Sequence, residues 1–164
     1  VLGARATASS ALAALGELGI VTSTVAARRF GGPGSVVAAS SRLGVSIEQV
    51  LWSDCDAVLR AVSAADLVIS TLPAGVADPL AEEMTVREGQ VLLDVVYSPR
   101  ETALRSAFER NGGIVAEGTD MLIYQAAAQV QLMTGRSPKT DVMRGALEAE
   151  LARRARVSGG GTAS

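Results

Sequence analysis

The chain has 164 residues, 48% of them hydrophobic and 20% charged, which predicts a globular domain with a substantial core. Its formal net charge of -2 gives no reason to expect a nucleic-acid partner, and no apolar run reaches membrane-spanning length, so no membrane partner is expected. The sequence contains no histidine, which excludes Ser-His-Asp and Cys-His catalysis within it and disfavours a zinc site.

Apolar runs typical of strands alternate with amphipathic runs typical of helices. The expected strands cover residues 1–3, 23–27, 45–52, 66–71, 90–97 and 114–118, and the expected helices cover residues 8–18, 33–43, 56–65, 101–113, 119–134 and 139–156. Gly19 and Gly44 are expected to end helices, and Asp54 to cap one. The alternation predicts an α/β fold with a doubly wound, mostly parallel sheet and C-terminal helices.

The domain organisation is expected to be simple. A Rossmann-like domain is predicted over residues 1–157, followed by a flexible Gly/Ser tail over residues 158–164. Val1 is predicted to lie in a buried strand, so a further portion of the protein is expected upstream of it. Cys55 is the only cysteine, so no intrachain disulfide forms and a cytoplasmic location is expected.

The loop after the first strand is the first candidate site, because ligands bind at the carboxyl ends of the strands in such sheets. Gly3 suits the tight turn of a dinucleotide loop, and Ala8 is small enough for close helix packing. Arg5 stands where a second glycine is expected, and its side chain can either contact a phosphate or occupy the phosphate site. The helix N-terminus, with its free N–H groups and positive end, is available to an anion. The alternative is an ordinary turn between a strand and a helix.

Arg28 and Arg29 follow the second strand, where an NAD-preferring site places an acidic residue. Two guanidinium groups suit a 2′-phosphate, so this loop favours NADP over NAD. The alternative is a pair of solvated loop arginines.

Two later segments also end at the ligand-binding edge. Tyr97 follows a buried strand, and its phenol can hydrogen-bond a polyhydroxy substrate; the alternative is a tyrosine with a packed ring and a solvated hydroxyl. Gln125 lies about two turns into the next helix, where its amide can both donate to and accept from a ligand. Met121, on the same helix, can either cover an apolar ring of the cofactor or pack into the core.

Together these segments resemble the cofactor-binding domain of the shikimate dehydrogenase family. The most specific match is an Asp-x-x-Tyr-x-Pro-x-x-Thr pattern that starts at Asp94, followed by Gly-x-x-Met-Leu-x-x-Gln-Ala from Gly118 and a helix that ends in Thr-Gly. The stretch "DLVISTLPAGV" resembles the family's Asn/Ser-Thr-x-Pro loop, with Thr71 and Pro73 in place. The resemblance covers residues 1–151.

The resemblance implies a Rossmann-like fold, NADP as cofactor and the reversible NADPH-dependent reduction of 3-dehydroshikimate to shikimate in aromatic amino-acid biosynthesis, the chorismate pathway. The residues implied in cofactor binding are Gly3, Ala4, Arg5, Ala6 and Thr7 at the pyrophosphate, Ala27, Arg28 and Arg29 at the 2′-phosphate, and Thr71, Val95, Gly118 and Met121 elsewhere along the cofactor. Tyr97 and Gln125 take positions that contact shikimate. No residue is assigned to a metal.

The chain departs from the family pattern in two ways. Arg5 and Ala6 replace glycines of the cofactor loop. The family's catalytic lysine and aspartate belong to the substrate domain and interdomain segment, expected upstream of Val1, and Lys139 matches neither. The chain alone is therefore expected to bind nucleotide without turnover. A non-catalytic nucleotide-sensing or scaffold module with a closed cofactor loop, a quinate/shikimate-type paralogue and a homodimeric assembly stay open.

Overall fold

The structure is a computed structural model that describes residues 1–159; residues 160–164, which belong to the predicted tail, lie outside the described residues. The chain divides into two compact units, Val1–Gly118 and Thr119–Ser164. The predicted single domain over residues 1–157 stays a prediction.

The first unit alternates strands and helices. Its strands are β1 (Thr22–Ala27), β2 (Ser46–Leu51), β3 (Leu67–Ser70), β4 (Val91–Asp94) and β5 (Ile114–Ala116), and its helices are α1 (Ala6–Glu17), α2 (Val36–Leu43), α3 (Cys55–Ala64), α4 (Asp78–Ala81) and α5 (Ala103–Arg110). The second unit is formed by α6 (Gly118–Thr134), which begins at the last residue of the first unit, and α7 (Thr140–Gly159). The first two residues of the predicted tail therefore lie in a helix.

The sheet is parallel throughout. β1 pairs with β2, and β3, β4 and β5 pair in that order. Leu2 joins the two groups, because it forms a parallel bridge to Ala26 of β1 and another to Ser70 of β3. The resulting strand order is β2, β1, the Leu2 segment, β3, β4 and β5. In a doubly wound sheet the chain adds strands first on one side of its first strand and then on the other, and the Leu2 segment has the place of that first strand. The predicted fold class is confirmed.

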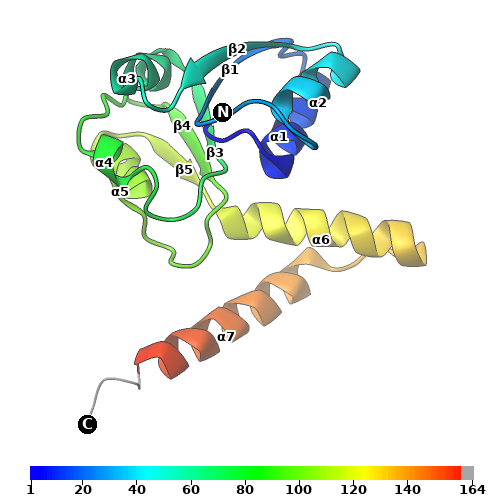
Figure 1. Cartoon of the computed structure of the whole chain (residues 1–164). Helices are drawn as coiled ribbons and strands as arrows, with labels where there is room; N and C mark the ends of the chain where they lie inside the picture. The colour runs from blue at the N-terminus through cyan, green and yellow to red at the C-terminus, as the bar shows by residue number, and fades with distance from the viewer. Residues whose placement is uncertain (160–164) are drawn as a thin grey trace. The chain divides into compact units, whose positions relative to one another are not determined.

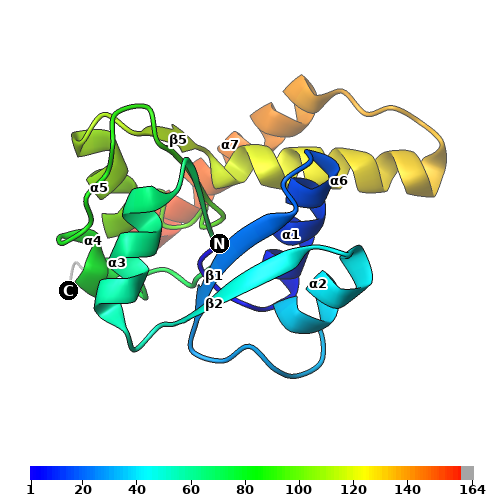
Figure 2. The same cartoon turned by 90° about the horizontal axis from the view of Figure 1, so that it is seen from above.

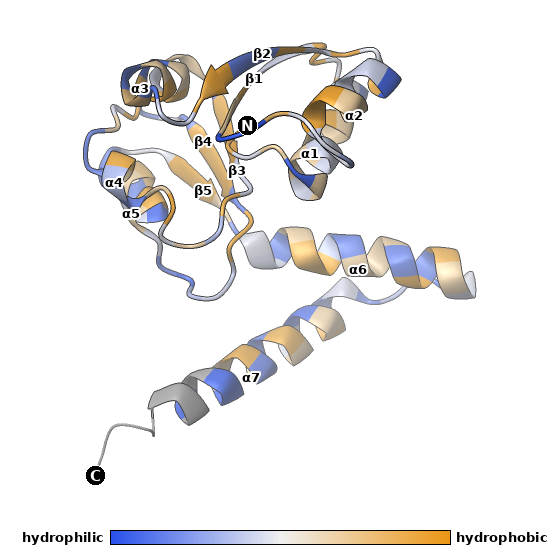
Figure 3. Cartoon of the chain, in the orientation of Figure 1, coloured by the Kyte–Doolittle hydropathy of each residue, from blue (hydrophilic) through white to orange (hydrophobic). Residues whose placement is uncertain are grey.

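Helices of the first unit cover both faces of this sheet (Figures 1 and 2). One hydrophobic cluster joins α1 and α2 to β1, with Ala8, Leu12 and Val36 at its centre. The other joins α3, α4 and α5 to β3 and β4, with Leu92 and Phe108 fully buried. Figure 3 shows much of β3 and β4 in hydrophobic colours, as expected for strands covered on both faces, whereas the edge strand β5 has two exposed residues.

Most predicted boundaries agree with the structure. Gly19 and Gly44 follow α1 and α2 with left-handed backbones, and Asp54 caps α3 by accepting a 3.0 Å hydrogen bond from the Ala57 amide. The predicted start of a helix at Pro33 is wrong, because Gly32 and Gly34 on either side have positive φ angles; Ser35 caps α2 instead. The single turn α4 was not predicted, since four residues are too few for a periodic pattern.

Candidate nucleotide-binding site

The first loop of the sheet is held by a contact between Gly3 and Thr71. Gly3 has a φ of 106°, and a Cβ added there would collide with Thr71 Oγ1, so only glycine fits this position. The Thr71 hydroxyl donates to the Leu2 carbonyl at 2.9 Å, and the Thr71 amide donates to the same oxygen at 2.8 Å. Two residues predicted to bind the cofactor, far apart in the sequence, therefore lie in direct contact.

The loop leads directly into α1. Arg5 is the N-cap residue, and its exposed side chain makes no capping hydrogen bond. Ala4 and Ala8 are buried, which draws the helix onto β1, whereas Ala6 and Thr7 are exposed. The amides of a first helical turn have no intrahelical acceptor, and no acidic residue lies in this turn. The positive end of the helix is thus available to an anion.

The second loop leaves the same edge of the sheet. Leu2 lies level with Ala26, so Gly3 and Ala27 end neighbouring strands, and the exposed Arg28 and Arg29 follow at once. The Ser9 hydroxyl of α1 donates to the Gly34 carbonyl at 3.1 Å, and the Val36 amide donates to the Ala4 carbonyl at 3.3 Å. These bonds fasten the second loop to the first.

The charge of this region is positive. Residues 1–47 contain four arginines, at positions 5, 28, 29 and 42, and only one acidic residue, Glu17. Three of these arginines lie in the two loops just described. An anion that approaches the N-terminus of α1 therefore meets cationic side chains and a positive helix end together.

The loop after β4 is closed by a hydrogen bond between the two ends of the Asp-x-x-Tyr-x-Pro-x-x-Thr pattern. Asp94 is buried; its Oδ2 accepts from the Thr102 hydroxyl at 2.9 Å, and its Oδ1 accepts from the Val96 amide at 3.2 Å. Thr102 Oγ1 also accepts from the Arg105 amide at 3.1 Å and so caps α5. Tyr97, on the loop between them, is 40% exposed. The phenol is thus held on a braced loop and remains accessible.

Gly118 touches the end of β4. A Cβ at Gly118 would lie 2.6 Å from the Asp94 carbonyl oxygen and 2.9 Å from the Val95 carbonyl carbon, so the two backbones meet where no side chain fits. A small hollow of about 10 Å³ lies between the loop after β3 and the loop after β4, and its lining includes Pro73, Asp94 and Thr102. The structure thus brings Val95 and Gly118 together, and their predicted place along the cofactor stays a prediction.

Glu117 is paired with two arginines just before Gly118. Its carboxylate lies 2.8 Å from a terminal guanidinium nitrogen of Arg105 and 3.7 Å from one of Arg100. The hydrogen bond from Arg105, aided by both positive charges, lowers the pKa of Glu117. Sequence reasoning missed the Asp94–Thr102 hydrogen bond and this ion pair. The hydrogen bond joins the first and last residues of the pattern at residues 94–102, so the pattern was a signal for it.

Met121 and Gln125 belong to the second unit. They lie four residues apart on α6 and so share one face of that helix, and Gln125 is exposed. Asp120 of α6 forms an ion pair with Arg144 of α7 and ties the two helices together. The roles of these two residues, like those of the other predicted site residues, stay predictions.

Other kinds of site find no support in the described part of the chain. Across residues 1–159, His, Cys, Asp and Glu side chains form no group that could hold a metal ion. Among the described helices, none is both long and apolar enough to cross a membrane.

Comparison with known proteins shows what the chain resembles. Residues 118–148 match the model of the shikimate 5′-dehydrogenase C-terminal domain. An NADP(+) shikimate dehydrogenase of Methanothermobacter thermautotrophicus is 38% identical over 97 residues, which cover 56% of this chain and 34% of that protein. The matched part is thus about a third of that relative's length.

Solved structures extend the likeness to nearly the whole chain. The shikimate dehydrogenase of Mycobacterium tuberculosis superposes with a TM-score of 0.74 at 37% identity, covering 90% of this chain and 55% of that one. The quinate dehydrogenase of Corynebacterium glutamicum, solved in complex with NAD, superposes with a TM-score of 0.75 at 25% identity, covering 90% of this chain and 53% of that one. The resemblance to shikimate dehydrogenases stated from the sequence is confirmed, for a chain that spans about half of these structures.

Proposed function

We propose that the chain is the NADP-binding half of a shikimate dehydrogenase, an oxidoreductase that reversibly reduces 3-dehydroshikimate to shikimate with NADPH. In the whole protein, a substrate domain supplies the catalytic lysine and aspartate, which no residue of this chain matches. The chain by itself then binds nucleotide and catalyses no turnover. We expect this enzyme in the cytoplasm, where it serves aromatic amino-acid biosynthesis.

One observation carries the proposal: the N-terminus of α1 faces two loops that are fastened together and contain three exposed arginines. First-turn amides from Ala6 onward suit the pyrophosphate, and Gly3 makes the tight turn that leads into the helix. Arg28 and Arg29 suit the additional 2′-phosphate of NADP. Relatives named as NADP(+) enzymes, such as that of M. thermautotrophicus, support this choice of cofactor.

The chemistry of the reaction comes from the cofactor, since NADP(H) carries the hydride. This chain's residues bind and orient it. Val95 and Gly118, whose backbones are in close contact, lie on the nicotinamide side of the cofactor in this proposal. The hydroxyl of Tyr97 and the amide of Gln125 hold the hydroxyl groups of a small polyhydroxy substrate.

Parallel calorimetric titrations with NADPH and NADH test the proposal. We expect saturable binding of NADPH and weaker binding of NADH. The double substitution Arg28→Ala, Arg29→Ala should weaken NADPH binding at least tenfold, about 1.4 kcal/mol, and leave NADH binding nearly unchanged, because only NADPH carries the 2′-phosphate. Arg42→Ala is the matched control, since Arg42 is exposed on the last turn of α2.

An absence of NADPH binding to the chain would contradict the proposal. Binding restored by Arg5→Gly would then favour the second candidate, a non-catalytic module whose cofactor loop is closed by Arg5. That candidate rests on the position of Arg5 as the N-cap residue of α1, from which its long, exposed side chain can lie over the helix end.

A quinate/shikimate-type paralogue is the third candidate, and it rests on the similarity to the C. glutamicum quinate dehydrogenase. Tighter binding of NADH than of NADPH would favour it.

The oligomeric state is a separate question. The chain's mass in sedimentation experiments distinguishes a homodimer from a monomer.

A further inference from the structure

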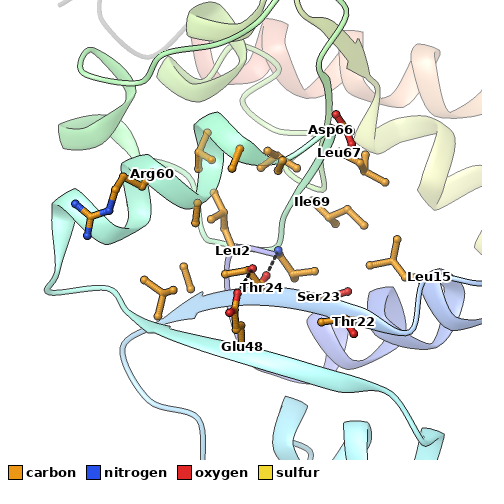
Figure 4. A pocket seen from close by; sticks show the side chains of 18 of the residues that line it. Leu2, Leu15, Thr22, Ser23, Thr24, Glu48, Arg60, Asp66, Leu67 and Ile69 are labelled. Atoms are coloured by element: carbon orange, nitrogen blue, oxygen red, sulfur yellow. Dashed lines mark hydrogen bonds between the residues drawn. The ribbon is translucent and has the colours of Figure 1, made fainter.

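The two ends of β1 have different surroundings. At its amino-terminal end, residues 22–24 line a cavity of about 590 Å³ (Figure 4). At its carboxyl end, Ala27 is buried, and the second loop, residues 28–35, begins with the exposed Arg28 and Arg29. The candidate nucleotide site uses the carboxyl end alone, so the contacts of the second loop decide where the two guanidinium groups lie.

The composition of the second loop favours flexibility. Three of its residues, Gly31, Gly32 and Gly34, are glycines, which lose more conformational freedom on folding than any other residue. Two exposed arginines at the start of such a loop would sample many positions if nothing held the loop in place. A phosphate site needs its cations in one place, so the contacts that hold this loop bear on its function.

We propose that Phe30 of the second loop and Ser9 of α1 are positioning residues that set the preference for NADP over NAD. This inference rests on the proposed function, in which Arg28 and Arg29 bind the 2′-phosphate. Phe30 holds the loop directly after the two arginines, and Ser9 holds it where the chain returns towards α2.

Phe30 fixes the start of the loop. Its half-buried side chain packs against the hydrophobic cluster that joins α1 and α2 to β1. Ala27 is buried in the same cluster, so Arg28 and Arg29 lie between two packed residues. The three residues from Ala27 to Phe30 span at most about 11 Å, which keeps the backbone of both arginines beside the end of β1.

Ser9 fixes the returning side of the loop. Its hydroxyl donates to the Gly34 carbonyl at 3.1 Å, and it also reaches the Arg5 carbonyl, one helical turn back, at 3.3 Å. The Val36 amide donates to the Ala4 carbonyl at 3.3 Å and holds the end of the loop beside the same helix. The second loop is thus attached to the helix whose N-terminus suits the pyrophosphate.

This attachment sets the separation of the two anion sites before any ligand binds. In NADP the 2′-phosphate and the pyrophosphate are attached to the same ribose, so their separation varies little. A loop that is already held at the matching position binds both groups without a further ordering cost. NADH lacks the 2′-phosphate and gains nothing from the position of the arginines, so the ratio of the two affinities reports how well the loop is held.

Calorimetric titrations of the full chain with NADPH and NADH test the proposal. We expect Ser9→Ala to lower the ratio of the NADH Kd to the NADPH Kd about threefold, because it removes one hydrogen bond that holds the loop. Ser10→Ala is the matched control, since the Ser10 hydroxyl donates to the Ala6 carbonyl of its own helix. This control should stay within about twofold of the parent ratio.

Substitutions at Phe30 test the other contact. Phe30→Ala should lower the same ratio about tenfold, because it removes the side chain that packs against the cluster. Phe30→Leu keeps an apolar side chain there and should recover most of this loss. If Phe30→Ala does not fold, as judged by circular dichroism, Ser9→Ala and its control decide the question, since they change only hydroxyl groups on α1.

A parent chain that prefers NADPH, with an unchanged ratio in Ser9→Ala and Phe30→Ala, would overturn this inference and leave the proposed function intact. Equal weakening of both cofactors would also overturn it, because a purely structural role has that effect. A parent chain without a preference for NADPH would contradict the proposed function and this inference together. The parent titration therefore distinguishes the two failures.

Discussion

The Thr102 hydroxyl donates a 2.9 Å hydrogen bond to the buried carboxylate of Asp94 and so closes the loop that carries Tyr97. The same Thr102 oxygen accepts from the Arg105 amide and begins α5. One side chain therefore fixes a strand end, a candidate substrate loop and a helix start at once. The hydrogen bond therefore gives a structural reason for the spacing between Asp94 and Thr102, and this reason involves no ligand.

Thr102→Val should destabilise the first unit by about 1–3 kcal/mol, because it removes the helix cap and a hydrogen bond to a buried carboxylate while keeping the shape of the side chain. Urea unfolding measures the loss. Thr102→Ser is the matched control, since it retains the hydroxyl and should stay within about 1 kcal/mol of the parent. Equal losses for both variants would show that the hydroxyl does not brace the loop.

Gly3→Ala should destabilise by about 2 kcal/mol or more, because the backbone at Gly3 is left-handed and the added Cβ meets Thr71 Oγ1. Thr71→Ala removes that oxygen, so the double variant should lose less than the sum of the two single variants. Unfolding of all four proteins completes the cycle. Strictly additive losses would contradict the contact between Gly3 and Thr71.

Gly118→Ala should be costly for a different reason, since the added Cβ meets the backbone of Asp94 and Val95, which cannot rotate away. We expect a loss of about 1–3 kcal/mol. Gly145→Ala, in α7, is the control: its Cβ meets nothing within 4 Å, and the substitution should stabilise the helix by about 0.5–1 kcal/mol. Circular dichroism during urea unfolding distinguishes the two. A neutral Gly118→Ala would contradict the close approach.

The ion pair of Glu117 should make stability depend on pH. Its folded-state pKa is lowered below the ordinary 4.5, so the pair contributes its full stability above that pH and loses it as the pH falls through the folded-state pKa. Glu117→Gln should therefore cost about 0.5–1 kcal/mol at pH 7, and the difference from the parent should shrink below pH 4.5.

Urea midpoints of the parent and Glu117→Gln, measured between pH 3 and 7, test this dependence. The Glu109→Gln variant is a useful comparison, because Glu109 contacts Arg105 at 2.9 Å from a more exposed position on α5. If the stability difference between the parent and Glu117→Gln grew as the pH fell, the result would contradict a stabilising ion pair at Glu117.

Much of this molecule follows from local sequence. The alternation of strands and helices, the stops at Gly19 and Gly44 and the cap at Asp54 each depend on a few neighbouring residues, and all agree with the structure. The start of α2 was misplaced, because Pro33 suits a first helical turn by itself, whereas the glycines on either side hold positive φ angles that end any helix there.

The sequence by itself determined the α/β class, the candidate loops and their positive charge, because periodicity, caps and charge are properties of short segments. Only the tertiary structure decided that Gly3 meets Thr71, that Asp94 bonds Thr102 and that Leu2 bridges β1 and β3. Such contacts depend on which strands become neighbours. Strand order is set by packing of the whole sheet against its helices, and no local pattern encodes it.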